Sequence, residues 1–160
     1  MKAYTNETEY KKYEYLNFHT TYGKSNHGRD YEKLIRSFDA KESLLDVGTG
    51  NGNFCKQMSP FFKKIYGVEW AIEQPEENNS NNIEYIKCAA QNIPLADNSV
   101  DITTSWDFLE HVIPQDVNKV IEQMVRVTKK YIFSTVATRP SGSHRRKLEE
   151  IFGDGELHPT

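Results

Sequence analysis

The sequence predicts an α/β domain in which a mostly parallel sheet of about five strands carries helices on both faces. Short runs rich in β-branched and aliphatic residues recur along the chain. Several of these runs are separated by segments with helical periodicity. Strands that alternate with helices favour a parallel sheet wound on both faces, so these two observations together predict the fold class.

The expected strands are each bounded by polar or turn-forming residues. They are Ser43 to Val47, Ile65 to Glu69, Ile83 to Cys88, Val100 to Trp106 and Tyr131 to Ala137. The first two contain nearly continuous apolar stretches, which is typical of parallel strands buried on both faces.

Three helices are expected around these strands. One opens at Gly52 and ends before Pro60, and a second covers Gln115 to Val127, where apolar residues recur at steps of three and four. A third precedes the first strand, with Tyr31 and Phe38 on one face. The polar stretch Glu73 to Asn82 has no apolar stripe, so we expect a solvated loop where a crossover helix would normally lie.

A chain of 160 residues and 18.5 kDa is long enough to form one domain with one core. We expect an N-terminal helical or lid segment at 1–42, a core at 43–137, and a C-terminal helix and tail at 138–160. Tyr10 to Tyr22, dense in aromatic residues, is the expected lid helix.

The composition argues against several function classes. The net charge of −3 gives no general reason to expect a nucleic acid or an anionic membrane as partner. No apolar run approaches the roughly 20 residues of a membrane helix, and residues 1–12 lack the apolar core of a signal peptide, so we expect a cytoplasmic protein. Cys55 and Cys88 are too few for a disulfide framework or a zinc site.

A glycine-rich turn carries the functional argument. Asp46 to Gly52, in the order Asp-Val-Gly-Thr-Gly-Asn-Gly, follows a strand and precedes a helix. Glycines there permit positive φ and close ligand approach, and we expect free backbone N–H groups that suit a carboxylate. Glu69 ends the next strand 21 residues after Gly48, the spacing at which an acid accepts hydrogen bonds from ribose hydroxyls.

The turn also argues against a dinucleotide site and against a phosphate-binding P-loop. The dinucleotide fingerprint requires a glycine where this chain has Asn53, and the lysine of a phosphate-binding P-loop is absent. The glycines instead alternate at positions 48, 50 and 52.

With these residues in place, the chain resembles the class I S-adenosylmethionine-dependent methyltransferases of the type 11 methyltransferase-domain group, which have a Rossmann-like fold. The matching segments run in the family's order: Leu44 to Gly52, Tyr66 to Glu69, Ala89 to Leu95, Asp97 to Asp101 and Phe108 to Val112. The resemblance covers Ser43 to Ala137 and names no acceptor.

The resemblance implies a set of contacts to S-adenosylmethionine. The residues concerned are Gly48, Thr49, Gly50 and Gly52 around the methionine part, Glu69 at the ribose, Trp70, Ala90 and Gln91 at the adenine, Trp106 beside the methyl donor, and Asp46 at the start of the glycine-rich loop. Ordinary core packing is the alternative interpretation of Trp106 and Phe108.

His111 is the candidate general base, because histidine titrates near neutrality; a structural role is the alternative. Asp107, Glu110 and His111 also resemble the Mg²⁺ site of small-RNA and some quinone O-methyltransferases, with His144 or His158 as the distant ligand. We expect catalysis without a metal and keep Mg²⁺ as the alternative hypothesis.

The given sequence ends at Thr160, whereas members of the family continue with a further helix and an antiparallel strand pair. We expect either a minimal variant with about five strands or a fragment of a longer chain. The hypothesis is that a second copy of the chain or another partner covers the open sheet edge. Arg139, Arg145, Arg146 and Lys147 form a basic cluster that could steer an anionic acceptor, or could be the solvated face of a helix.

The sequence therefore predicts a methyltransferase that acts on a small-molecule acceptor. The alternatives are a non-catalytic S-adenosylmethionine-binding subunit of a heteromeric complex, a Mg²⁺-assisted O-methyltransferase acting on RNA or a quinone, and a protein that binds another nucleoside.

Overall fold

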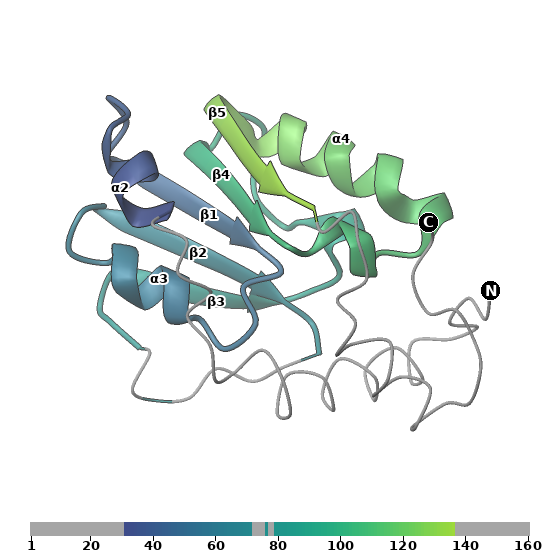
Figure 1. The fold of residues 1–160 in the computed structure, drawn as a ribbon, viewed down its shortest axis with the longest axis horizontal. Helices are drawn as coiled ribbons and strands as arrows, with labels where there is room; N and C mark the ends of the chain where they lie inside the picture. The colour runs from purple at the N-terminus through teal and green to yellow at the C-terminus, as the bar shows by residue number, and fades with distance from the viewer. Residues whose placement is uncertain (1–30, 72–75, 77–78, 137–160) are drawn as a thin grey trace.

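The computed structural model describes residues 31–71, 76 and 79–136. Within these residues the chain forms one sheet with helices on both of its faces (Figure 1). The elements run in the order α2 (Tyr31–Arg36), β1 (Ser43–Val47), α3 (Asn53–Met58), β2 (Lys64–Glu69), β3 (Ile83–Lys87), η3 (Ala90–Asn92), β4 (Val100–Trp106), η4 (Leu109–His111), η5 (Pro114–Asp116), α4 (Val117–Val127) and β5 (Thr128–Thr135).

The five strands of the described sheet are all parallel, in the order β3-β2-β1-β4-β5. The chain leaves β1 toward β2 and β3 and then returns to place β4 on the other side of β1. The carboxyl ends of β1 and β4 therefore flank the point where the strand order reverses, which is where open α/β sheets bind ligands. The predicted α/β class is confirmed.

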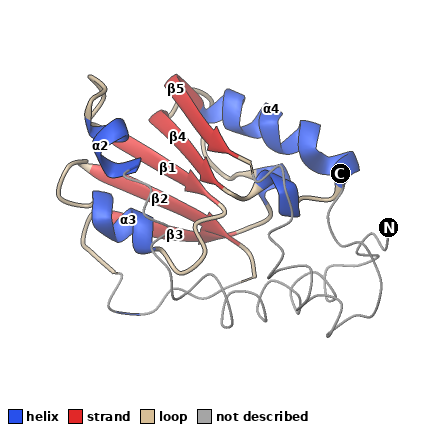
Figure 2. Ribbon diagram, in the orientation of Figure 1, coloured by secondary structure: helices blue, strands red, loops and turns tan. Residues whose placement is uncertain are grey.

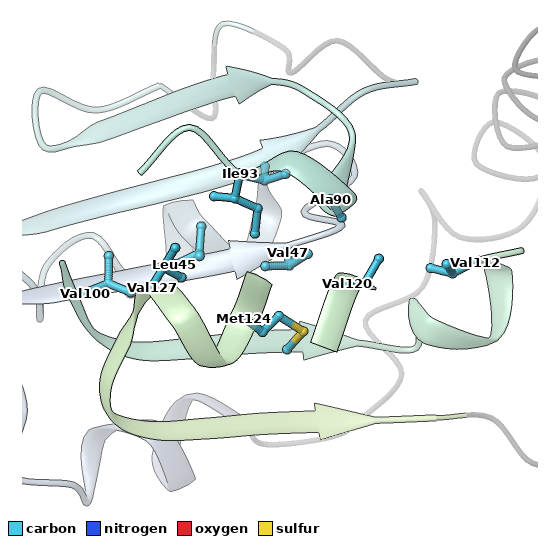
Figure 3. Packing of buried hydrophobic residues seen from close by; sticks show 10 residues of the cluster. Leu45, Val47, Ala90, Ile93, Val100, Val112, Val120, Met124 and Val127 are labelled. Carbon is cyan, nitrogen blue, oxygen red and sulfur yellow. The ribbon is translucent and has the colours of Figure 1, made fainter. Parts of the chain in front are cut away.

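Two apolar clusters hold the layers together, and β1 contributes to both because successive side chains point to opposite faces. Leu44 belongs to the cluster under α2 and α3, together with Ile35 and Met58. Leu45 belongs to the cluster under α4, with Val120 and Met124 (Figure 3). Figure 2 shows the helices on both sides of the sheet, so the expectation of two covered faces is confirmed.

The observed strand bounds agree closely with the expected ones except at β5. This strand begins at Thr128 rather than Tyr131 and ends at Thr135. Thr128 follows the last residue of α4 directly and is already extended, with φ −93° and ψ 133°, and it pairs with Val100. The polar run from Thr128 to Lys130 gave no sign of this start, because β5 lies at the edge of the described sheet and the side chains of Lys129 and Lys130 are exposed.

Several expectations lie outside the described residues. They are the lid helix at Tyr10–Tyr22, half of the loop at Glu73–Asn82, the C-terminal segment 138–160 with its basic cluster, and the distant ligands His144 and His158. In the part of the chain that the structure describes, no helix is long and apolar enough to cross a membrane.

Candidate functional site

The glycine-rich loop joins β1 to α3 in a left-handed backbone conformation. Gly48, Gly50 and Gly52 have φ values of 74°, 57° and 80°. In this region other residues are disfavoured by about 1–2 kcal/mol because Cβ approaches the following carbonyl oxygen. The left-handed backbone conformation therefore explains why glycine occupies all three alternating positions.

Two of these glycines also stand against aromatic rings. A Cβ added to Gly48 would overlap the ring of Phe108, and one added to Gly52 would overlap the end of the Tyr85 side chain. The Tyr85 hydroxyl donates a hydrogen bond to the carbonyl oxygen of Gly52 at 3.3 Å. The loop is thus packed closely from both sides.

The backbone N–H groups of the loop are engaged within the protein. Those of Gly48 and Thr49 donate to the carbonyl oxygen of Val68 at 2.9 and 3.1 Å, and that of Gly52 donates to Thr49. The N–H of Gly50 donates to Glu69. The expectation that the loop presents free N–H donors is wrong for these four groups, because they anchor the loop to the end of β2 and to itself.

Glu69 connects the end of β2 to the glycine loop. One carboxylate oxygen, Oε2, accepts the Gly50 N–H at 3.1 Å. The other, Oε1, accepts the N–H groups of Trp70 and Ala71, each at 2.9 Å. The carboxylate is thereby oriented by the backbone at the carboxyl edge of the sheet, where the sequence placed a ribose-binding acid.

An open cleft lies beside this carboxylate and has a volume of about 450 Å³, its mouth included. Most of its walls are apolar. The lining residues are Gly48, Val68, Glu69, Trp70, Cys88, Ala89, Ala90, Gln91, Phe108, His111, Val112 and Ile113. The structure therefore brings together six of the predicted site residues: Gly48, Glu69, Trp70, Ala90, Gln91 and His111.

Asp46 lies beneath the loop and not in the cleft lining. It is 2% exposed and accepts a hydrogen bond from the Thr104 hydroxyl at 2.8 Å. Burial raises the pKa of Asp46 to about 7; the hydrogen bonds from Thr104 and Thr49 oppose this rise, and the charge of Glu69 adds to it. Asp46 is a buried carboxyl that supports the loop from below.

Thr49, Gly50, Gly52 and Trp106 also lie outside the cleft lining. The Thr49 hydroxyl contacts the Cys55 sulfur at 3.2 Å. Trp106 stacks on Tyr31 of α2, with ring centroids 4.0 Å apart and an angle of 10°, and meets Phe54 of α3 edge-on. Its indole therefore packs in the layer between the sheet and α2 and α3, in keeping with the alternative interpretation of Trp106 as a core residue.

Asp107, Glu110 and His111 do not share one helical turn. Asp107 has a φ of 48° and precedes η4, and its carboxylate accepts a hydrogen bond from Thr135 at 2.9 Å. Glu110 and His111 belong to η4. Across the described ranges, no three His, Cys, Asp or Glu side chains gather closely enough to hold a metal ion.

Sequence reasoning missed part of the cleft wall. Phe108 lines the cleft against Gly48, and Val112 and Ile113 extend the same wall. Their signal in the sequence is only that apolar residues follow β4 directly. Cys88 lines the cleft and also packs against the cluster under α4.

Comparison with known proteins accounts for this geometry. Residues 45–131 match the model of the Methyltransferase domain family, which is more than half of the chain. The chain belongs to this family. The match begins in β1 and includes the glycine loop, the cleft walls and α4.

Individual relatives agree with the assignment. An uncharacterized methyltransferase of Mycobacteroides abscessus is 33% identical over 125 residues, which cover 69% of this chain and 46% of the relative. The chain thus spans less than half the length of that relative.

Solved structures with low sequence identity share the fold. A phosphoethanolamine N-methyltransferase of Haemonchus contortus, solved with phosphoethanolamine and S-adenosylhomocysteine, superposes with a TM-score of 0.67 at 16% identity over 88% of this chain and 34% of that one. A methyltransferase of Haloferax volcanii, solved in complex with the activator Trm112, superposes with a TM-score of 0.58 at 17% identity over 90% of this chain and 63% of that one.

Proposed function

We propose that this chain binds S-adenosylmethionine in the cleft and transfers its methyl group to a small-molecule acceptor. The observation that carries the proposal is the oriented carboxylate of Glu69, held by the Gly50 N–H at 3.1 Å beside a cleft with mostly apolar walls. A carboxylate accepts hydrogen bonds from ribose hydroxyls, and apolar walls suit a nucleobase. Membership in the methyltransferase family supports the same ligand.

The residues of the cleft fit a nucleoside that carries an amino-acid chain. Gly48 lines the cleft together with Phe108, whose ring packs against that glycine. Trp70, Ala90 and Gln91 would border the adenine, and Glu69 would hold the ribose. Among the described residues that line the cleft there is no lysine or arginine to bind a phosphate group, which argues against NAD or ATP.

S-adenosylmethionine supplies a methyl group that is already activated by a sulfonium. The task of the protein is then to align the acceptor with that methyl group and to exclude water. His111 lines the cleft and is the candidate to take the proton that an acceptor O–H or N–H releases. An acceptor that reaches the cleft already deprotonated needs no such base.

Calorimetry with S-adenosylmethionine, S-adenosylhomocysteine, NAD and ATP tests the donor site. We expect the first two to bind and the last two not to bind. Binding of NAD or ATP alone would overturn the proposal.

A transfer assay tests the acceptor. The protein is incubated with methyl-labelled S-adenosylmethionine and a cell extract, and the products are separated by size. We expect label in the small-molecule fraction; label confined to RNA or protein would contradict a small-molecule acceptor. The phosphoethanolamine enzyme of Haemonchus contortus is one structural neighbour with a small acceptor.

A second candidate is a methyltransferase that needs a partner chain. Among the described residues, β5 is an edge strand, and the nearby apolar side chains of Ile121, Val125 and Ile132 are 42%, 58% and 40% exposed. The Haloferax volcanii neighbour was solved with an activator. Methyl transfer by the purified chain alone, with a monomeric mass by light scattering, would argue against this candidate.

A further inference from the structure

A side-chain hydrogen bond joins one wall of the cleft to the segment that follows the opposite wall. One wall is formed by 89–91, which includes the start of η3, and the other by 111–113. Gln91 belongs to the first wall, and Asp116 of η5 follows the second wall by three residues. The Gln91 Nε2 donates to the Asp116 Oδ2 at 3.2 Å.

This bond settles which way the Gln91 amide faces. An ionised carboxylate accepts hydrogen bonds and donates none, so only the NH₂ end of the amide can face Asp116. The carbonyl end, Oε1, must then point away from Asp116. The described residues offer Oε1 no hydrogen-bond donor, while Gln91 itself lines the cleft.

Asp116 is itself held in place. Its second oxygen, Oδ1, accepts a hydrogen bond from Lys119 Nζ at 3.3 Å. Each carboxylate oxygen thus has its own donor.

We propose that Asp116 is a positioning residue that fixes the Gln91 amide, so that its carbonyl oxygen accepts a hydrogen bond from the exocyclic amine of the ligand's purine. The site then selects a 6-amino purine over a 6-oxo purine. This inference rests on the proposed function, because it concerns the base of the bound nucleoside. A glutamine without such a partner can turn its amide over and serve as acceptor or donor, so the selectivity comes from Asp116.

The wall that carries Gln91 does not depend on this bond. Arg126 of α4 donates to the carbonyl oxygens of Ile93 and Leu95, both at 2.7 Å. The Ile93 N–H donates to Gln123 Oε1 at 3.3 Å. Loss of the bond to Asp116 is therefore expected to turn an amide and not to move the wall.

Asp116→Asn is the decisive variant because it keeps the size of the side chain. Asp116 precedes α4 and makes no side-chain capping bond, so the helix should keep its stability. In the variant we expect the Lys119 ammonium to donate a hydrogen bond to the amide oxygen of the new side chain. The NH₂ group of that side chain then faces Gln91. Gln91 must then offer its carbonyl oxygen to residue 116 and its NH₂ to the cleft.

The readout is the ratio of two dissociation constants measured by calorimetry. One ligand is S-adenosylhomocysteine, and the other is its inosine analogue, in which an oxygen replaces the exocyclic amine. We expect the wild-type protein to prefer the adenine ligand by about tenfold or more, and Asp116→Asn to lower this preference by about tenfold, roughly the effect of one hydrogen bond in a buried site.

Two further variants separate positioning from a merely structural role. Lys119→Met leaves the bond between Gln91 and Asp116 in place and should keep the wild-type ratio. Gln91→Met removes both hydrogen-bonding groups and should lower the ratio whatever residue 116 is. A structural role of Asp116 would weaken both ligands together and leave the ratio unchanged.

The outcomes distinguish this inference from the proposed function. If the wild-type protein fails to bind S-adenosylhomocysteine, the proposed function is overturned and this inference with it. If the ligand binds and Asp116→Asn keeps the wild-type ratio, only the positioning role of Asp116 is overturned. If Asp116→Asn does not fold, Gln91→Met decides instead, because an unchanged ratio in that variant would overturn the carbonyl acceptor.

Discussion

The carboxylate of Glu69 and the backbone N–H of Gly50 meet at 3.1 Å, although the two residues belong to different strand ends. Glu69 closes β2, and Gly50 lies in the turn after β1. The bond joins the two segments that a nucleoside with an amino-acid chain would contact at once. A change at Glu69 should therefore affect the ribose contact and the loop together.

Replacing Glu69 with glutamine should weaken S-adenosylhomocysteine binding. The amide keeps the size of the carboxylate but loses the charge that strengthens hydrogen bonds from ribose hydroxyls and from the Gly50 N–H. Hydrogen bonds to charged groups contribute about 1.5–3 kcal/mol, so we expect a loss of affinity of about tenfold to a hundredfold by calorimetry. Glu84→Gln is the matched control, because Glu84 lies on β3 and pairs with Lys64 at 2.8 Å. Equal losses in the two variants would contradict the ribose role.

Gly48→Ala should destabilise the fold through two separate effects. The φ of 74° costs an alanine about 1–2 kcal/mol, and the added Cβ overlaps the Phe108 ring. Phe108→Ala makes room for that Cβ, so the double variant should lose less stability than the sum of the single variants. Urea unfolding of the four proteins measures this coupling. Strictly additive losses would show that the ring is not what confines Gly48.

The sequence predicted the buried strands well because burial on both faces leaves a clear pattern. Ser43–Val47 and Val100–Trp106 have the expected bounds. The start of β5 was missed since Thr128 to Lys130 are polar, and an edge strand does not require apolar residues there. Pairing with β4, not side-chain character, sets that boundary.

The sequence predicted the cleft residues whose positions follow from the order of the strands. It missed those whose positions depend on a single backbone dihedral angle. The carboxyl ends of the parallel strands share one edge of the sheet, so the order of the strands predicts that residues at or just after these ends lie close together. These residues are Gly48, Glu69, Ala90 and Gln91. Asp107 adopts a φ of 48° between Trp106 and Phe108. The structure places Phe108 in the cleft and Trp106 against α2. No pattern of residues in the sequence predicts the left-handed turn at Asp107 that lies between them.

Trp106→Leu should lower stability and leave the ligand affinity nearly unchanged. The indole stacks on Tyr31 and meets Phe54, so its loss opens space between the sheet and its helices. Large-to-small changes in such layers cost about 2–4 kcal/mol. Phe108→Leu is the matched variant on the cleft side and should weaken S-adenosylhomocysteine binding more than Trp106→Leu does. If calorimetry on folded protein shows a larger loss of affinity for Trp106→Leu than for Phe108→Leu, Trp106 contacts the methyl donor after all.

Asp46 should make the stability of the fold depend on pH. Burial raises its pKa to about 7 from an ordinary value of 3.8, so the folded chain holds a proton that the unfolded chain releases between these values. The stabilisation is complete below about pH 4 and is lost as the pH rises through about 7. Wild-type protein should therefore lose stability relative to Asp46→Asn across this window, by a few kcal/mol at the order-of-magnitude level.

Urea unfolding of both proteins at several pH values between about 4 and 8 measures this difference. Thr104→Val supplies a second check. It removes the hydrogen bond at 2.8 Å that holds the pKa of Asp46 down, so the pH at which the stabilisation is lost should move upward. Glu69, Cys55 and Tyr85 are the other titratable groups that interact with Asp46, and all three are unchanged in these variants. Parallel curves for wild type and Asp46→Asn would mean that the Asp46 carboxyl keeps its ordinary pKa beneath the loop.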